Sequence, residues 1–167
     1  MAQITLKGNP INTCGTLPAV GSAAPDFVLT KSDLSNVSLA DFAGRTKILN
    51  IVPSLDTPVC QVSMRTFNEK AASLTNAVVL TVSRDLPFAM NRFCETEGIE
   101  TAIPLSEMGN RDFGAAYGME ITDGPLAGVL GRAIVVIDGG GKVTHNELVP
   151  EIAQEPDYDA ALAAANG

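Results

Sequence analysis

The sequence of 167 residues is poor in positive charge. It has 11 Lys and Arg against 19 Asp and Glu, which gives a formal net charge of −8. The few basic residues are scattered rather than clustered, and an acidic chain repels phosphate groups. We therefore expect no binding to nucleic acid and, for the same reason, none to an anionic membrane surface.

Long apolar runs are also missing. No stretch reaches the ~18 consecutive apolar residues of a membrane span, and the segment Met1–Pro10 lacks the unbroken apolar run of a secretory signal. Hydrophobic residues still make up 46% of the chain, which excludes intrinsic disorder. A chain of roughly 150 residues is most often one domain. We expect a cytoplasmic protein with a single domain over residues 1–167.

Cysteine and histidine are scarce. The three cysteines are Cys14, Cys60 and Cys94, they form no CxxC pair, and His145 is the only histidine. A structural zinc site needs four nitrogen or sulfur ligands, usually in close pairs, and is therefore disfavoured. Three cysteines are also too few for a disulfide scaffold. The sequence is consistent with a reduced compartment and with one or two working thiols, or none.

The apolar pattern predicts strands that alternate with helices. The expected strands are Gln3–Leu6, Ile11–Cys14, Ala24–Thr30, Val37–Leu39, Lys47–Val52, Ala77–Ser83, Thr101–Leu105, Arg132–Asp138 and Lys142–Leu148. The expected helices run from Pro58 to about Leu74 and over Pro87–Glu97, Asn110–Tyr117 and Asp157–Ala165.

This order is that of a thioredoxin-like α/β fold. Strands that precede helices pair in parallel through right-handed crossovers. The tight turn Gly139–Gly141 makes the last two strands an antiparallel hairpin. We therefore expect a mixed central β-sheet flanked by helices. The N-terminal hairpin, with its tip at Gly8–Pro10, is expected to be an added decoration.

Cys60 lies at the expected start of a helix. Thr57 is a favourable N-cap and Pro58 suits the first helical position, so Cys60 falls in the first turn. Unpaired N–H groups and the positive end of the helix dipole meet there. Such a position favours the thiolate form of cysteine, which is the nucleophile.

A purely structural interpretation of Cys60 remains open. Cys60, Phe67, Ala71 and Leu74 share one helical stripe, and cysteine is among the most buried residue types. The turn before the helix, with Pro53 and the Thr57–Pro58 cap, weighs against simple packing without excluding it.

The other two cysteines have weaker signals. Cys94 lies beside the apolar stripe of the next helix, where it is either a small apolar filler or a partner thiol for Cys60. A disulfide needs Cα atoms ~4.4–6.8 Å apart, so such pairing predicts local unwinding of at least one helix. Cys14 has no helix start and no evident partner, so we expect it simply to pack.

Arg132 opens an apolar strand, which is unusual for an arginine unless something binds it. It could pair with a carboxylate or extend into water. In a thioredoxin-like fold, this strand lies near the start of the first helix. A fixed cation there would stabilise a thiolate and donate hydrogen bonds to an oxygen ligand.

The motif Pro53-x-x-x-Thr57-x-x-Cys60, together with Arg132, resembles the active-site signature of the peroxiredoxins. The resemblance is closest to the thiol peroxidases, the atypical two-cysteine subfamily, and it covers essentially the whole chain. The segments that carry it are Pro53–Cys60, Ser63, Arg65, Phe67, Asn68, Arg84–Ala89, Arg92–Cys94, Gly124–Leu126, Arg132–Ala133, Glu147–Ile152 and Glu155–Tyr158. Cys14 and Gly131 do not belong to the pattern.

The resemblance implies a role for each matching residue. Cys60 matches the peroxidatic cysteine, and Cys94 matches the resolving cysteine of the same subunit. Thr57 matches the hydroxyl that hydrogen-bonds the peroxide, Pro53 the residue that shields the sulfur, and Arg132 the guanidinium that polarises the peroxide.

For the whole protein, the resemblance implies a thioredoxin-dependent peroxidase. Its substrates would be hydrogen peroxide and organic hydroperoxides, and it would act as a homodimer in antioxidant defence and redox homeostasis. No metal, flavin or haem cofactor is expected.

Two other functions compete with peroxide reduction. A general thiol–disulfide oxidoreductase is disfavoured by the missing CxxC. A redox-sensing or holdase-type binding protein would use the thiols only to change shape, and it is compatible with peroxidase activity. The sequence does not rank hydrogen peroxide against bulkier hydroperoxides, although Pro87–Met90 and Leu126–Leu130 could line an apolar entrance.

Overall fold

The computed structural model describes all residues from Met1 to Gly167 and contains two sheets. The strands are β1 (Gln3–Leu6), β2 (Asn9–Asn12), β3 (Val28–Thr30), β4 (Asn36–Ser38), β5 (Thr46–Ile51), β6 (Ala77–Ser83), β7 (Ala102–Ser106), β8 (Ala133–Ile137) and β9 (Val143–Leu148). The helices are α1 (Pro58–Ala71), α2 (Pro87–Glu97), α3 (Asp112–Ala116), α4 (Tyr158–Asn166) and the short 3-10 helix η1 (Leu39–Phe42).

Seven strands form the central sheet in the order β4-β3-β7-β6-β5-β8-β9. The three strands β5, β6 and β7 pair in parallel, whereas β8 is antiparallel to β5 and β9 is antiparallel to β8. The middle strands are buried on both faces, which explains their nearly continuous runs of Val, Ile and Leu. The expected thioredoxin-like fold with a mixed sheet is confirmed.

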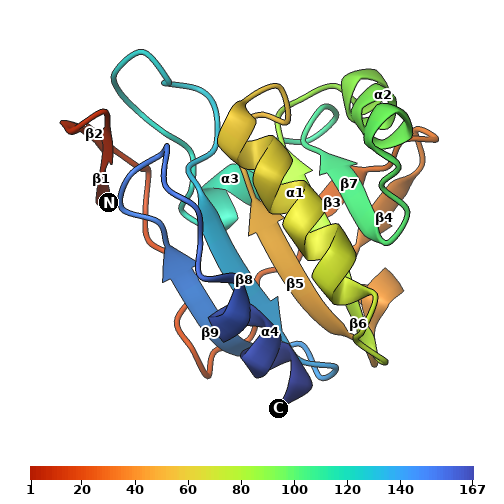
Figure 1. Ribbon diagram of the computed structural model, residues 1–167. Coiled ribbons are helices and arrows are strands. Elements are labelled where there is room, and N and C mark those ends of the chain that lie inside the picture. Colours follow the sequence, from red (N-terminus) through yellow and green to blue (C-terminus); the bar gives the residue numbers. More distant parts are fainter.

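The core consists of two apolar layers, one on each face of this sheet. The helices α1, α2 and α4 cover one face, and α1 and α4 cross it side by side (Figure 1). On the opposite face, α3 packs with the β3–β4 region against the alternate residues of the same strands. Because side chains alternate along each strand, neighbours such as Ile48 and Leu49 enter different layers.

The helix boundaries follow from local signals in the sequence. Thr57 has the extended backbone of an N-cap, and Pro58 occupies the first helical position of α1. Gly98 ends α2 in the left-handed conformation, with φ 64. Asp157 caps α4 by accepting a hydrogen bond from Ala160 N–H. None of the helices is long and apolar enough to cross a membrane.

Four local expectations are wrong in detail. The tip of the N-terminal hairpin is Lys7–Gly8, where both residues have positive φ, so Asn9 and Pro10 lie in β2 instead. Ala24–Phe27 is irregular, and only Val28–Thr30 forms a strand. Leu39 begins the 3-10 helix η1 rather than ending a strand. Helix α1 stops at Ala71, three residues before Leu74.

A buried ion pair fixes the segments that follow β6 and β7. Arg84 contacts Glu107 at 2.6 Å, and their side chains are 6% and 0% exposed. Arg84 also binds Glu120 at 3.0 Å and donates a hydrogen bond to the carbonyl of Gly128. Burial raises the pKa of Glu107, although Arg84 and the Gly114 N–H oppose this shift. The pair therefore holds the 107–128 region against the end of β6.

Replacing Arg84 by Met should destabilise the protein by about 3–5 kcal/mol, because Glu107 would be left buried without its cation. Urea denaturation measures this change in the free energy of unfolding. The control is Lys70→Ala, which removes a salt bridge to Asp159 with exposed side chains and should cost less than about 1 kcal/mol. Equal effects of the two variants would contradict the role of the buried pair.

Candidate active site

The candidate site forms where β5 ends and β8 begins. These strands are antiparallel, with Ile51 opposite Ala133, so the loop after β5 lies beside the residue that precedes β8. That residue is Arg132, and the loop leads through Pro53 and Thr57 into α1. Sheet topology therefore brings together residues that are distant in the sequence.

Cys60 is fully buried, at 0% exposure, in the first turn of α1. Its sulfur accepts a hydrogen bond from Arg132 Nη2 at 3.3 Å. The N–H groups of Val59 and Cys60 precede the first hydrogen bond of the helix, which runs from Gln61 N–H to the Thr57 carbonyl. Cys60 also packs in one apolar cluster with Phe67 and Ala71, so the packing and first-turn interpretations both hold.

Arg132 is a buried cation without a carboxylate partner. It is 1% exposed and belongs to none of the four ion pairs of the structure. Its Nε donates to the carbonyl of Ile152 at 2.8 Å, and its Nη1 has no hydrogen-bond partner. A buried charge is costly unless it is paired. The Cys60 sulfur is the side-chain acceptor that this buried guanidinium contacts.

Thr57 and Pro53 line a cavity together with Arg132, the residue that contacts the sulfur. The Thr57 hydroxyl does not cap the helix and instead donates to the Ser54 carbonyl at 2.9 Å. That hydroxyl oxygen keeps its acceptor capacity, while Pro53 is buried at the turn itself. Four of the five expected site residues, Pro53, Thr57, Cys60 and Arg132, therefore lie together.

A cavity of about 210 Å³ opens beside Arg132 and Thr57. Most of its lining is apolar, and the residues are Leu6, Pro53, Thr57, Pro58, Val59, Leu126, Arg132, Ile152 and Ala153. The sequence indicated Pro87–Met90 and Leu126–Leu130 as a possible apolar entrance. Leu126 lines this cavity, whereas no residue of Pro87–Met90 does. A small molecule with an apolar body and a polar end fits such a lining.

The N-terminal hairpin is an addition to the central sheet, as expected, and it also contributes to this cavity. Leu6 of β1 lines the cavity. The hairpin is fixed by Glu151, whose carboxylate accepts from the Thr5 hydroxyl at 2.6 Å and from the N–H groups of Lys7 and Gly8. These hydrogen bonds lower the pKa of Glu151 to about 2. In the sequence, Ile4 and Leu6 alternate with the polar Gln3 and Thr5, which marks one apolar face of the strand but does not say what that face packs against.

Cys94 lies apart from this cavity, on α2. It is half-buried and packs against the same apolar cluster as Cys60, but the two are free thiols in this structure. Cys94 also borders a surface cavity of about 320 Å³ between α2 and β7. Burial, and then the charge of Glu95, raise the pKa of Cys94 to about 11. Cys94 is therefore a neutral thiol at neutral pH.

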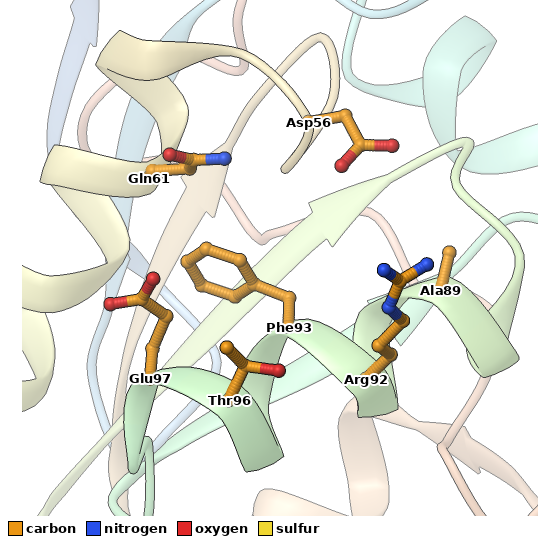
Figure 2. Close-up of a pocket in the computed structure, with 7 residues that line it drawn as sticks. All are labelled: Asp56, Gln61, Ala89, Arg92, Phe93, Thr96 and Glu97. Atoms are coloured by element: carbon orange, nitrogen blue, oxygen red, sulfur yellow. The ribbon is translucent and has the colours of Figure 1, made fainter.

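A second gap, of about 240 Å³, separates the start of α1 from α2. Figure 2 shows the ring of Phe93 reaching from α2 toward Gln61, the residue after Cys60. A Cys60–Cys94 bond would have to form across this region, and the residues next to both cysteines border it. Both cysteines are free thiols here, so the local unwinding of at least one helix that a Cys60–Cys94 bond would require stays a prediction.

Cys14 does not pack in the core, and that expectation is wrong. It is exposed because Thr13, its neighbour along the chain, takes the buried position. Its sulfur lies 3.5 Å from the carbonyl oxygen of Gly114.

Comparisons with known proteins agree with this geometry. A model of the Redoxin family matches residues 19–162. The chain is 61% identical to the thiol peroxidase of Mycobacterium tuberculosis over 165 residues, covering 98% of each chain. It is 51% identical to the thiol peroxidase of Leptospira interrogans over 168 residues, covering 99% of this chain and 98% of that protein.

Solved structures show the same fold. A peroxiredoxin-like protein from Aquifex aeolicus superposes with a TM-score of 0.94 at 39% identity, over 99% of this chain and 96% of that one. Thiol peroxidase from Chromobacterium violaceum gives a TM-score of 0.91 at 22% identity, over 98% and 95% of the two chains. The chain therefore belongs to the Redoxin family and, within it, to the thiol peroxidases. Its class of activity is that of a peroxidase.

The raised pKa of Cys94 predicts slow alkylation at neutral pH, because only the thiolate reacts. Its rate with iodoacetamide should rise about tenfold per unit from about pH 8 to pH 10. A quenched time course read by peptide mass spectrometry measures this rate. Glu95→Gln should speed the reaction at a given pH, because it removes a charge that raises the pKa. A rate independent of pH would contradict the assignment.

Proposed function

We propose that this protein reduces hydrogen peroxide and organic hydroperoxides through Cys60, with Cys94 as the resolving thiol and thioredoxin as the reductant. The observation that carries the proposal is the 3.3 Å contact between Arg132 Nη2 and the Cys60 sulfur, in a buried site where the arginine has no carboxylate partner. An electron-rich sulfur beside a fixed cation is suited to attack a peroxide oxygen.

In the first step, the Cys60 thiolate attacks the nearer oxygen of the peroxide. A sulfur–oxygen bond forms as the oxygen–oxygen bond breaks, so Cys60 becomes a sulfenic acid and the peroxide gains two electrons. The leaving oxygen takes up a proton and departs as water or an alcohol. The partnerless Nη1 of Arg132 would donate to the oxygen on which charge develops. The Thr57 hydroxyl, whose proton goes to the Ser54 carbonyl, would accept a hydrogen bond from the peroxide O–H.

In the second step, the Cys94 sulfur displaces the hydroxyl of the sulfenic acid, which leaves as water, and a disulfide forms. Thioredoxin then supplies two electrons and two protons to regenerate both thiols. Two features support attack by an external dithiol on this bond. Cys94 is only half-buried, and it borders a cavity that opens at the surface.

The apolar lining of the cavity beside Arg132 supports organic hydroperoxides as substrates in addition to hydrogen peroxide. Leu6, Leu126 and Ile152 offer contacts to an alkyl group, while Arg132 and Thr57 face the peroxide end. We further propose that the protein acts as a homodimer in the cytoplasm, in antioxidant defence and redox homeostasis. The exposed side chains of Leu86 and Phe88 at the start of α2 provide apolar surface for such a contact.

The three cysteines should respond differently to replacement by Ser. Cys60→Ser should abolish peroxide consumption in the thioredoxin-coupled assay, because the thiol that attacks the peroxide in the first step is removed. Cys94→Ser should react once with peroxide and then stall, whereas Cys14→Ser should match the unmodified protein. Retained turnover in Cys60→Ser would contradict the proposed function, and normal cycling of Cys94→Ser would contradict its resolving role.

Replacing Arg132 by Met should lower the rate constant for oxidation of Cys60 by about 10²–10³-fold, since it removes a donor aimed at the developing charge. Competition with horseradish peroxidase for hydrogen peroxide measures this rate constant. Arg65→Met serves as the control, because this arginine of α1 is more than one-third exposed and pairs with Glu97. A full rate in Arg132→Met, or an equal loss in Arg65→Met, would contradict the assignment.

A further inference from the structure

Asp85 lies two residues after the end of β6 and contacts the loop that precedes α1. Its Oδ1 accepts a hydrogen bond from the Ser54 hydroxyl at 2.7 Å, and its Oδ2 accepts one from the Leu55 N–H at 2.7 Å. Because β5 and β6 are parallel, both chains leave the sheet at the same edge, which places this carboxylate against the loop.

The loop residues that Asp85 binds are those that fix Thr57. The Ser54 carbonyl accepts hydrogen bonds from both the N–H and the hydroxyl of Thr57, at 3.2 and 2.9 Å. Leu55 is 2% exposed and packs in the same apolar cluster as Cys60. A continuous set of contacts therefore runs from Asp85 through Ser54 to Thr57, three residues before Cys60.

Asp85 is itself fixed by the sheet. The Ser83 hydroxyl donates to its Oδ2 at 2.7 Å, and the Ser106 hydroxyl at the end of β7 donates to its main-chain carbonyl. The carboxylate thus accepts three hydrogen bonds, and its position is set by two strands. Asp85 is therefore held in place by β6 and β7, and it can in turn fix the irregular loop that it binds.

We propose that Asp85 is the positioning residue for the peroxide-reducing site: it fixes Ser54 and Leu55, and through them the place of Thr57 and Cys60 relative to Arg132. Asp85 does not touch the sulfur. It also lies two residues before Pro87, the first residue of α2, so it joins the Cys60 loop to the start of the helix that carries Cys94. This inference rests on the proposed function.

The rate of attack depends steeply on the alignment of the sulfur with its donors. A displacement of about 1 Å in an active site can cost on the order of 10²-fold in rate. Removing the Asp85 carboxylate frees the Ser54–Leu55 segment, and the sulfur and the Thr57 hydroxyl then no longer occupy one fixed geometry beside Arg132. The effect should appear in the reaction with peroxide, whereas the later reaction of the disulfide with thioredoxin should be spared.

The test compares Asp85→Ala, Asp85→Asn and Asp138→Ala. Asp138 is the matched control, because its carboxylate also fixes an irregular segment: it accepts hydrogen bonds from the N–H groups of Gly140 and Lys142 in the turn between β8 and β9. Oxidation of Cys60 is followed in a Cys94→Ser background, in competition with horseradish peroxidase. In the intact enzyme, kcat/KM is measured separately for peroxide and for thioredoxin.

We expect Asp85→Ala to lower the rate constant of Cys60 oxidation by about 10–100-fold, with kcat/KM for thioredoxin unchanged. Asp85→Asn keeps one acceptor oxygen for the Leu55 N–H and should recover part of the loss, and Asp138→Ala should keep the full rate. If Asp85→Ala does not fold, Ser54→Ala removes one hydrogen bond to the carboxylate and should give a smaller loss in the same step.

The positioning role is overturned by any of three results. These are an unchanged oxidation rate in every folded Asp85 and Ser54 variant, an equal loss in Asp138→Ala, or an equal loss of kcat/KM for both substrates in Asp85→Ala. If the rate is unchanged in these variants and the parent protein reacts with peroxide, only the proposed role of Asp85 is contradicted. A parent protein that does not react at all removes the proposed function itself.

Discussion

The contact between a buried guanidinium and a buried sulfur is the constraint on which the site depends. Arg132 is shielded from water and has no carboxylate partner, so burying this cation beside Cys60 costs free energy. Its hydrogen bonds to the Cys60 sulfur and the Ile152 carbonyl offset part of that cost, and the free Nη1 can donate to an oxygen ligand. The surrounding structure, from the Ile152 carbonyl to the first turn of α1, keeps these two groups together.

The sheet explains why this contact can form at all. Three strand ends meet at one edge: β5 and β6 leave the sheet there, and β8 enters it. β5 leads to the Thr57–Cys60 helix start, β6 leads to Arg84 and Asp85, and β8 is preceded by Arg132. The adjacent residues Arg84 and Asp85 hold opposite sides of the site, since Arg84 binds the Glu120–Gly128 region that carries Leu126, and Asp85 binds the Ser54–Leu55 loop.

Most of the architecture could be predicted from the sequence, because its signals are local. The β-branched run of Ala77–Ser83 predicts a strand, and Pro87 and Gly98 predict where α2 begins and ends. In the structure, β6 spans Ala77–Ser83, and α2 begins at Pro87 and is capped by Gly98. Cys60 and Arg132 stood out for similar reasons, namely a helix start and a charge at the head of an apolar strand. The contribution of Leu6 to the cavity could not be predicted, because it depends on where Glu151 fixes the hairpin. Asp85 was missed because its role depends on the register of β5 and β6, which no single segment encodes.

The complete burial of the Cys60 sulfur has a consequence for the oxidants and reagents that the protein meets. The space of about 210 Å³ between Leu6, Leu126 and Arg132 reaches the guanidinium that contacts the sulfur, whereas Cys60 itself is not part of its lining. Peroxides are small enough to enter it, whereas oxidised glutathione and the disulfides of other proteins are too bulky to align with an enclosed atom. For the proposed peroxidase, this burial would therefore disfavour mixed-disulfide formation between Cys60 and bulky partners, while small oxidants could still react.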